Sequence, residues 1–131
     1  MEILNNESAI LVFNESLNAI EVYWKGHIKS DAYKGVMELA YDALIKYSAT
    51  EWLSDMTHVG VTSPGYQQWM KQEFVPKCAK AGLKRVAVVE AKDVFARFYV
   101  DKVKTSLGEN DLLNERFKTR EEAHEWLKSC L

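Results

Sequence analysis

The segment RVAVV, from Arg85 to Val89, contains four consecutive apolar residues and follows a glycine, Gly82, that suits the end of a helix. A strand with one solvent-exposed face alternates apolar and polar residues, so an unbroken apolar run predicts a strand that is covered on both faces. Strands of that kind lie at the centre of parallel sheets, with helices packed on either side. The chain is therefore expected to build an α/β domain around this segment.

Strand-like and helix-like patterns alternate along the rest of the chain. Strands are predicted within AILVFNES, NAIEVYWKG, TEWLSDM and NDLLNERFKT. Helices are predicted over SDAYKGVMELAYDALIKY, from Ser63 onward, over residues 93–107 and after Thr119. The order β-β-α-β-α-β-α-β-α predicts an α/β fold with a mixed, centrally parallel sheet of four to five strands and about four helices. The chain has 131 residues without a linker or a repeat, so residues 1–131 are expected to form a single domain.

The second predicted strand has a regular alternation. Ile20, Val22 and Trp24 fall on one side of the strand, and Glu21 and Tyr23 fall on the other. Alternation of apolar and polar residues is typical of a strand with one face on the core and one face in water. This strand is therefore predicted to be half-exposed.

Two of the predicted helices carry sequence signals of their own. Pro64 suits a first helical position, where its missing N–H has no partner to lose. Pro76 falls inside the same helix and is expected to kink or split it, because proline removes a backbone donor. Thr119 and Glu122 have the spacing of a capping box, which predicts the start of the last helix.

Composition places the chain among ordinary globular proteins and narrows its function. Apolar residues make up 47% and charged residues 27%. The N-terminal residues lack the pattern of a signal peptide, and no apolar run has the roughly 20 residues that a membrane span needs, so a cytoplasmic, non-spanning protein is expected. The formal net charge of −2 argues against a general nucleic-acid binder.

The charge is unevenly distributed. Residues 1–62 hold four Lys and nine acidic residues, whereas residues 63–104 hold nine Lys and Arg and four acidic residues. This basic band includes Lys71, Lys77 and Lys80 of the second predicted helix. It is either a set of solvated helix faces or a surface for an acidic partner or an anionic ligand.

The segment from Asp55 to Ser63 holds the most suggestive polar residues. It should lie beyond the carboxyl ends of the parallel strands, where ligands collect in open sheets. Asp55, His58 and Ser63 are the residue types of a hydrolase triad, but the sequence has no G-x-S-x-G elbow. In the simpler interpretation Asp55 ends a strand and binds nearby backbone N–H groups, while Ser63 caps a helix. In the functional one, Thr62 or Ser63 is phosphorylated or holds an anion at the helix start.

Cysteine and histidine do not predict a metal or redox centre. Cys78 falls on the apolar side of a helix and is interpreted as a core residue, and Cys130 as a second free thiol. His27, His58 and His124 lie in three different predicted elements without the spacing of a zinc site. No metal ion and no cofactor is expected, and the chain is not expected to be an enzyme.

Several segments together resemble a known family. The strand pair, EWLSDM leading into a helix, AGLKRVAVV and the closing FKTREEAHEWL are similar to the SpoIIAA-like branch of STAS-type domains, which is also described as STAS/SEC14-like. The resemblance covers nearly the whole chain in element order, and EEAHEWL is its most telling part. It implies an α/β fold, frequent homodimers, and a non-enzymatic role in protein–protein signalling or in sensing small ligands and lipids.

The resemblance also implies a regulatory position. In the anti-sigma-factor antagonists that define STAS domains, a serine after the third strand is phosphorylated within an Asp-Ser-Ser/Thr-Gly-type motif. Asp55 resembles the acid of that motif, and Met56 and Thr57 stand where its hydroxyl residues would be. Thr57 and Ser63 are therefore the candidate regulatory positions that the resemblance implies.

The expected function has two forms. The first is a regulatory or binding module that contacts a protein partner through the Asp55–Ser63 segment and the basic second helix. The second is a carrier of a small apolar ligand or lipid, since SEC14-like relatives hold a lipid in an apolar pocket. The residues that would line such a pocket could equally fill a core; they are Tyr66, Trp69, Met70, Phe74, Phe95 and Phe98.

Overall fold

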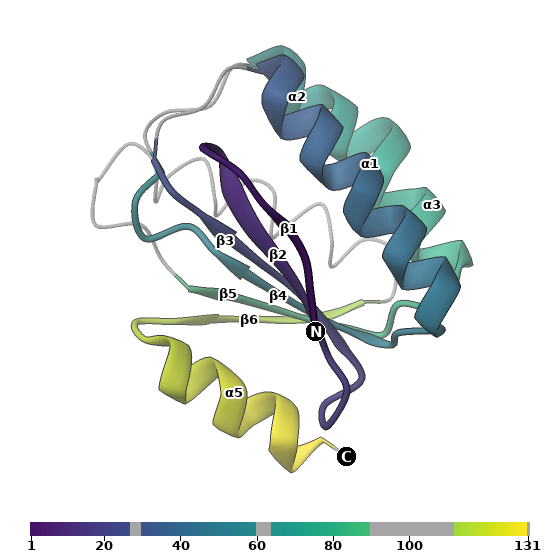
Figure 1. Ribbon diagram of the computed structural model, residues 1–131. Helices are drawn as coiled ribbons and strands as arrows, with labels where there is room; N and C mark the ends of the chain where they lie inside the picture. The colour runs from purple at the N-terminus through teal and green to yellow at the C-terminus, as the bar shows by residue number, and fades with distance from the viewer. Residues whose placement is uncertain (27–29, 60–63, 90–111, 131) are drawn as a thin grey trace.

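The computed structural model describes residues 1–26, 30–59, 64–89 and 112–130. Its centre is one six-stranded sheet in the order β1-β2-β3-β4-β5-β6 (Figure 1). β2 pairs antiparallel with both β1 and β3, and β3 to β6 pair in parallel. The strands are β1 (Glu2–Asn5), β2 (Ala9–Asn14), β3 (Ala19–Trp24), β4 (Glu51–Asp55), β5 (Arg85–Val89) and β6 (Leu113–Phe117).

The α/β class and the parallel centre are confirmed, but the predicted strand count of four to five is too low. The extra strand is β1, which pairs with β2 at the edge of the sheet. It is only four residues long, and its apolar residues, Ile3 and Leu4, are adjacent rather than alternating. A segment this short carries too little periodicity to be recognised before its pairing partner is known.

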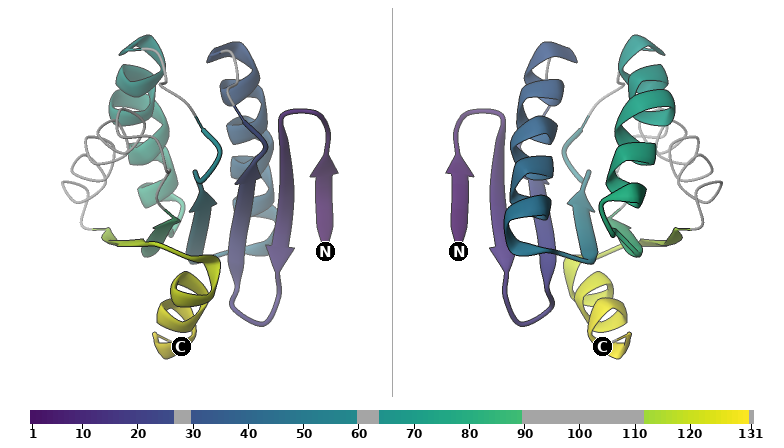
Figure 2. Two further views of the ribbon diagram at one scale, coloured as in Figure 1. Left: turned by 90° about the vertical axis from the view of Figure 1, so that its left-hand side faces the viewer. Right: turned by 90° about the vertical axis from the view of Figure 1, so that its right-hand side faces the viewer.

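Helices cover both faces of the sheet, as the apolar run in β5 predicts. One face carries α1 (Ser30–Tyr47) together with α2 (Pro64–Trp69) and α3 (Val75–Lys80), and the other carries α5 (Arg120–Ser129) (Figures 1 and 2). The core on the first face is large and includes the buried side of α1. The core under α5 is much smaller, and its buried members are Leu17, Ala19, Leu53, Ala87, Val89, Ala123 and Leu127.

The second predicted helix is split, as expected from Pro76. Between α2 and α3 lies a π-helical turn, Met70–Phe74, in which the N–H of Val75 donates to the carbonyl of Met70. Pro76 lies in the first turn of α3 and has no N–H that could donate a hydrogen bond to a carbonyl of the preceding turn. Together these turns form the α2–α3 unit, residues 64–80. It is followed by Gly82, whose φ of 110° few other residues tolerate. The helix predicted over residues 93–107 lies outside the described residues.

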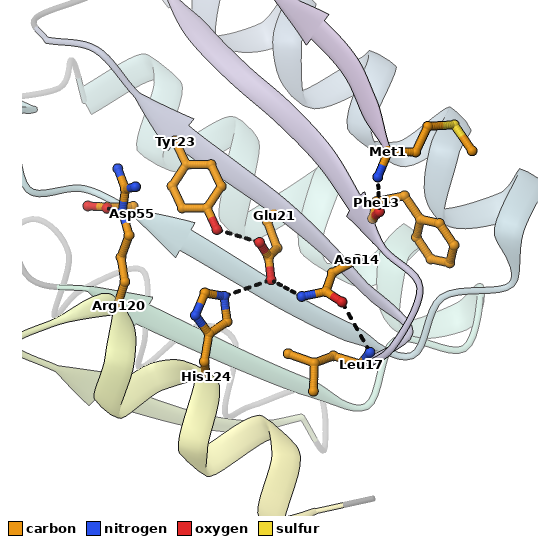
Figure 3. Close-up of polar contacts among 9 residues, drawn as sticks. All are labelled: Met1, Phe13, Asn14, Leu17, Glu21, Tyr23, Asp55, Arg120 and His124. Atoms are coloured by element: carbon orange, nitrogen blue, oxygen red, sulfur yellow. Dashed lines mark hydrogen bonds and ion pairs between the residues drawn. The ribbon is translucent and has the colours of Figure 1, made fainter.

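The prediction that β3 is half-exposed is wrong. Five of its six residues are buried, and even Glu21 is only 3% exposed. The alternation is real, since Ile20, Val22 and Trp24 belong to the larger core. The polar side, however, faces α5 rather than water, which creates an unusual polar layer between the helix and the sheet (Figure 3).

Candidate functional site

Asp55 is the last residue of β4, in register with Tyr23 of β3 and Val89 of β5. One carboxylate oxygen, Oδ1, accepts from the backbone N–H of Thr57 at 3.0 Å and from the Thr57 hydroxyl at 2.5 Å. The other, Oδ2, accepts from Nε of Arg120 at the start of α5. Asp55 thus ends a strand at the carboxyl edge of the parallel strands and binds a nearby N–H, as its sequence position predicts.

The environment of Asp55 keeps its carboxyl group ionised. Burial by itself would raise the pKa of this carboxyl group, because the charged form loses hydration. The hydrogen bonds from Thr57 and Arg120 outweigh burial, so the pKa of Asp55 lies below its usual value. Both oxygens already have partners within the fold, so the group is better suited to holding structure than to proton transfer.

Glu21 is a second buried carboxylate on the same face of the sheet (Figure 3). Oε2 binds Nδ2 of Asn14 at 3.0 Å and Nε2 of His124 at 2.9 Å, and Oε1 accepts from the hydroxyl of Tyr23. His124 is on α5, so the helix supplies a partner to this carboxylate as well. Burying a carboxylate is costly unless its oxygens are hydrogen-bonded, and three side chains bond to them here.

Tyr23 links the two carboxylates. Its hydroxyl binds Glu21, and the guanidinium carbon of Arg120 lies 4.1 Å from the centre of its ring. Burial and the hydrogen bond to Glu21 raise the pKa of Tyr23, so the phenol stays protonated and remains a donor. We call Glu21, Tyr23, Asp55, Arg120 and His124 the α5 polar layer. Its members fasten α5 to β3 and β4.

Residues of the predicted apolar pocket lie at the carboxyl edge of the sheet on the opposite face. Tyr66 and Met70 are buried in the larger core, and Trp69 is half-buried against it. Tyr66 belongs to a series of neighbouring aromatic rings. The ring centroid of Tyr33 lies 4.6 Å from those of Trp24 and Tyr66, and the ring centroids of Tyr66 and Trp69 are 5.9 Å apart. Phe95 and Phe98 lie outside the described residues.

One polar atom in this aromatic cluster is unsatisfied. Tyr33 is 1% exposed, and its hydroxyl has no hydrogen-bond partner in the part of the chain that the structure describes. Leaving a buried donor unpaired costs about 1–3 kcal/mol, and native proteins rarely do so. Tyr33 was not singled out in the sequence, because its spacing on the first helix looks like that of any core residue.

The crystal structure of an uncharacterized protein of the DUF3478 family from Shewanella loihica PV-4, described as having a SpoIIAA-like fold, matches with a TM-score of 0.61. The match covers 95% of this chain and 98% of that chain, at 17% sequence identity. This chain has a SpoIIAA-like fold. No protein-family model matches the sequence, and neither does any curated protein.

The SpoIIAA-like fold confirms what the resemblance implied about architecture. Within it, the polar residues predicted as a site separate into two groups. Asp55 and Thr57 are in direct contact, and His58 is exposed beside them. Thr62 and Ser63 lie outside the described residues. The α5 partners of the carboxylates, Arg120 and His124, were not predicted, since nothing in the local sequence links them to β3 or β4.

The basic helical unit of this SpoIIAA-like fold is only partly available for binding. Lys77 pairs with Glu38 at 3.1 Å and lies 4.2 Å from the centre of the Tyr41 ring. Lys71 and Lys80 are exposed. The free part of the basic surface is therefore smaller than the sequence indicates.

Among the described residues, no three His, Cys, Asp or Glu side chains are grouped closely enough to hold a metal ion. Nor does any described helix have the length and apolarity to cross a membrane. Cys78 is buried as predicted, and burial raises the pKa of its thiol to about 12.

Proposed function

We propose that this chain is a non-enzymatic regulatory module of STAS type that acts by binding another protein. The observation that carries the proposal is the pairing of Asp55 with Thr57 and Arg120. A catalytic acid or base must reach its substrate with a free lone pair or proton, whereas this carboxylate is buried and bonded at both oxygens. Among the described residues after β4, His58 is exposed to solvent, which suits contact rather than chemistry.

The partner surface that we propose combines His58 with the exposed side of the α2–α3 unit. Lys71 and Lys80 are exposed there and Lys80 lies in the last turn of α3. A cation at a helix C-terminus is favoured by the helix dipole and is free to meet a carboxylate of a partner. The partner is accordingly expected to present an acidic surface.

Thr57 is the position at which we expect this module to be regulated. Its hydroxyl lies 2.5 Å from a buried, ionised carboxylate of Asp55. A phosphate on Thr57 would add about −1.5 to −2 charges next to that carboxylate, and the two groups would repel. The turn after β4 would have to rearrange, so modification of Thr57 would change the proposed contact surface directly.

The experiment compares partner capture by two charge-reversal variants. Chains carrying Lys71→Glu and Lys80→Glu, or Lys118→Glu and Lys128→Glu as the control, are cross-linked in the source cells and their partners identified by mass spectrometry. Both pairs change the charge equally at exposed positions, but the control pair lies near α5. We expect a partner that the control captures to be lost from the Lys71→Glu, Lys80→Glu variant. Equal capture by both variants would exclude the proposed surface.

A small-ligand carrier is the second candidate function, and one observation favours it. The unpartnered hydroxyl of Tyr33 lies in an aromatic cluster at the carboxyl edge of β3, which is where open α/β sheets commonly bind ligands. Native mass spectrometry of the protein purified from its source cells tests this candidate. A mass that is lost on denaturation is expected from a carrier.

A further inference from the structure

We propose that the face of β1–β3 on the α5 side of the sheet binds an amphipathic helix of another protein, one with an apolar stripe and an acidic flank. This face carries Ile10 and Val12 of β2, Tyr23 of β3 and, directly after β3, Lys25. It lies on the opposite side of the sheet from α1 and the α2–α3 unit, so it would be a second contact surface, separate from the one that we propose on α2–α3.

The sequence of β2 indicates that both faces of this strand are covered. Residues 9–13 are all apolar, a longer run than that of β5. A strand with one solvent-exposed face alternates apolar and polar residues, whereas a strand covered on both faces does not. Alternate residues of β2 belong to the larger core, but Ile10 and Val12 are half-buried and belong to neither core. The described residues therefore leave one apolar face of β2 without a cover.

The uncovered face has the width of one helix. α5 packs over β4, β5 and β6, and no described helix lies in front of β1 and β2 in the left view of Figure 2. Neighbouring strands lie about 4.8 Å apart, so β1 to β3 span about 10 Å, which is the diameter of an α-helix. A helix at this position would lie beside α5 and extend the second helical layer of the α/β sheet.

Ile10, Val12 and the Tyr23 ring form a continuous apolar strip on this face. Ile10 is directly opposite Tyr23 in the register of β2 and β3, and Val12 points to the same side of the sheet two residues later. The apolar residues of an amphipathic helix recur at three- and four-residue spacing and form a stripe. Such a stripe would cover the strip and remove it from water.

The charges at the border of the strip favour an acidic flank on that helix. On the α5 side, the Arg120 side chain is 54% exposed, and among the described residues only its Nε is bonded, to Asp55. Lys25 is exposed at the end of the strip, and its Nζ donates to Oδ1 of Asn5 at 2.8 Å, which places it on the same face. Glu2 is exposed at the opposite border, beside Val12. The acidic flank of the bound helix should therefore lie next to α5.

The test uses two synthetic amphipathic peptides that differ only in charge. Both carry leucine along one helix face; the first has glutamate along one flank, and the second has lysine at the same positions. Affinities come from the fluorescence anisotropy of the labelled peptides. In the wild-type chain, the methyl NMR signal of Ile10 should shift on binding, and that of Ile45 on the exposed side of α1 should not.

Three variants accompany the wild-type chain. Ile10→Thr combined with Val12→Thr makes the strip polar while it keeps β-branched residues in the strand. Lys25→Glu reverses one bordering charge. Leu39→Gln is the control, because it removes an exposed apolar side chain from α1 on the other side of the sheet.

The wild-type chain and the control are expected to bind the glutamate peptide about three- to tenfold more tightly than the lysine peptide, and high salt should reduce this ratio. The double threonine variant should bind both peptides about tenfold more weakly. Lys25→Glu should remove the preference for glutamate. Equal affinities in the wild-type chain, no binding of either peptide, or unchanged binding by the double threonine variant would overturn the proposal.

The thermal midpoint and the solution mass of the peptide-free chain give independent results. Because Ile10 and Val12 lack a cover among the described residues, the double threonine variant should unfold at nearly the wild-type midpoint. A clearly lower midpoint would mean that the chain covers this face by itself. A dimeric mass that becomes monomeric in the double variant would identify a second copy as the occupant. Either result would overturn the proposal of an acidic partner helix.

Discussion

The Arg120 guanidinium group stacks on the Tyr23 ring, with its central carbon 4.1 Å from the ring centre, while Nε of the same group binds Asp55. One side chain at the start of α5 therefore contacts both β3 and β4. The apolar contact of α5 is modest, since only Ala123 and Leu127 are fully buried on the helix. Much of the attachment of α5 must then come from its polar contacts.

Replacing Arg120 by alanine should weaken this attachment. Asp55 would keep its bonds to Thr57 but lose its only described cation, and the Tyr23 ring would lose its stacked neighbour. We expect the free energy of unfolding to fall by about 2 kcal/mol, because the buried Asp55 carboxylate loses its cation. The loss is smaller than for a fully buried ion pair, since the Arg120 side chain is half-exposed. Urea titration measures the loss. Arg120→Lys should recover only part of it, since lysine lacks the planar group, and Lys118→Ala should change little.

The pairing of Asp55 also sets a pH dependence. Its folded-state pKa is lowered, so the carboxylate stabilises the fold above the usual Asp pKa of about 3.9. That contribution is lost as the pH falls through the folded-state value. The stability difference between the wild-type chain and Asp55→Asn should therefore narrow as the pH falls below about 4. Urea titrations across this range test it, with exposed Asp42→Asn as the control. A pH-independent difference would contradict the role assigned to the charge.

The features that were predicted from sequence are those with a local cause. The apolar run in β5 predicts that this strand is buried on both faces, and Pro76 predicts the break between α2 and α3. Thr119 caps α5 as predicted, and its hydroxyl accepts from the N–H of Glu122 at 3.2 Å. In each case the physical reason lies within a few residues of the signal.

The α5 polar layer was not predicted, because its cause is not local. Glu21 alternates with apolar residues as a solvent-facing residue would, and only the packing of α5 makes it buried. Its partner His124 is 103 residues away in the sequence. A sequence pattern records which face of a strand is polar, but it does not record whether water or a helix with complementary side chains covers that face.

Two tyrosines, half-buried Tyr23 and buried Tyr33, offer a comparison of the same chemical change. Tyr23→Phe removes a hydroxyl that donates to Glu21 and keeps the ring that Arg120 contacts. It should lower the free energy of unfolding by about 1 kcal/mol, the usual net value of one hydrogen bond. Tyr33→Phe makes the same chemical change where the hydroxyl has no described partner, and it should not lower the stability. Chemical denaturation of both variants distinguishes them. A similar loss in both would mean that the Tyr33 hydroxyl also has a hydrogen-bond partner in solution.

The two free thiols should react very differently with a disulfide reagent such as DTNB. Cys78 is buried against the larger core with a thiol pKa raised to about 12, whereas Cys130 is half-exposed at the end of α5. The thiolate is the reacting species, so at pH 8 we expect one thiol per folded chain to react quickly and the second only as fast as the protein opens. The Cys130→Ser variant isolates the slow reaction, and added urea should accelerate it together with unfolding. Rapid labelling of Cys78 in the folded Cys130→Ser chain would mean that the α2–α3 unit opens readily, and a dynamic partner surface would then be a better description of that unit than a rigid one.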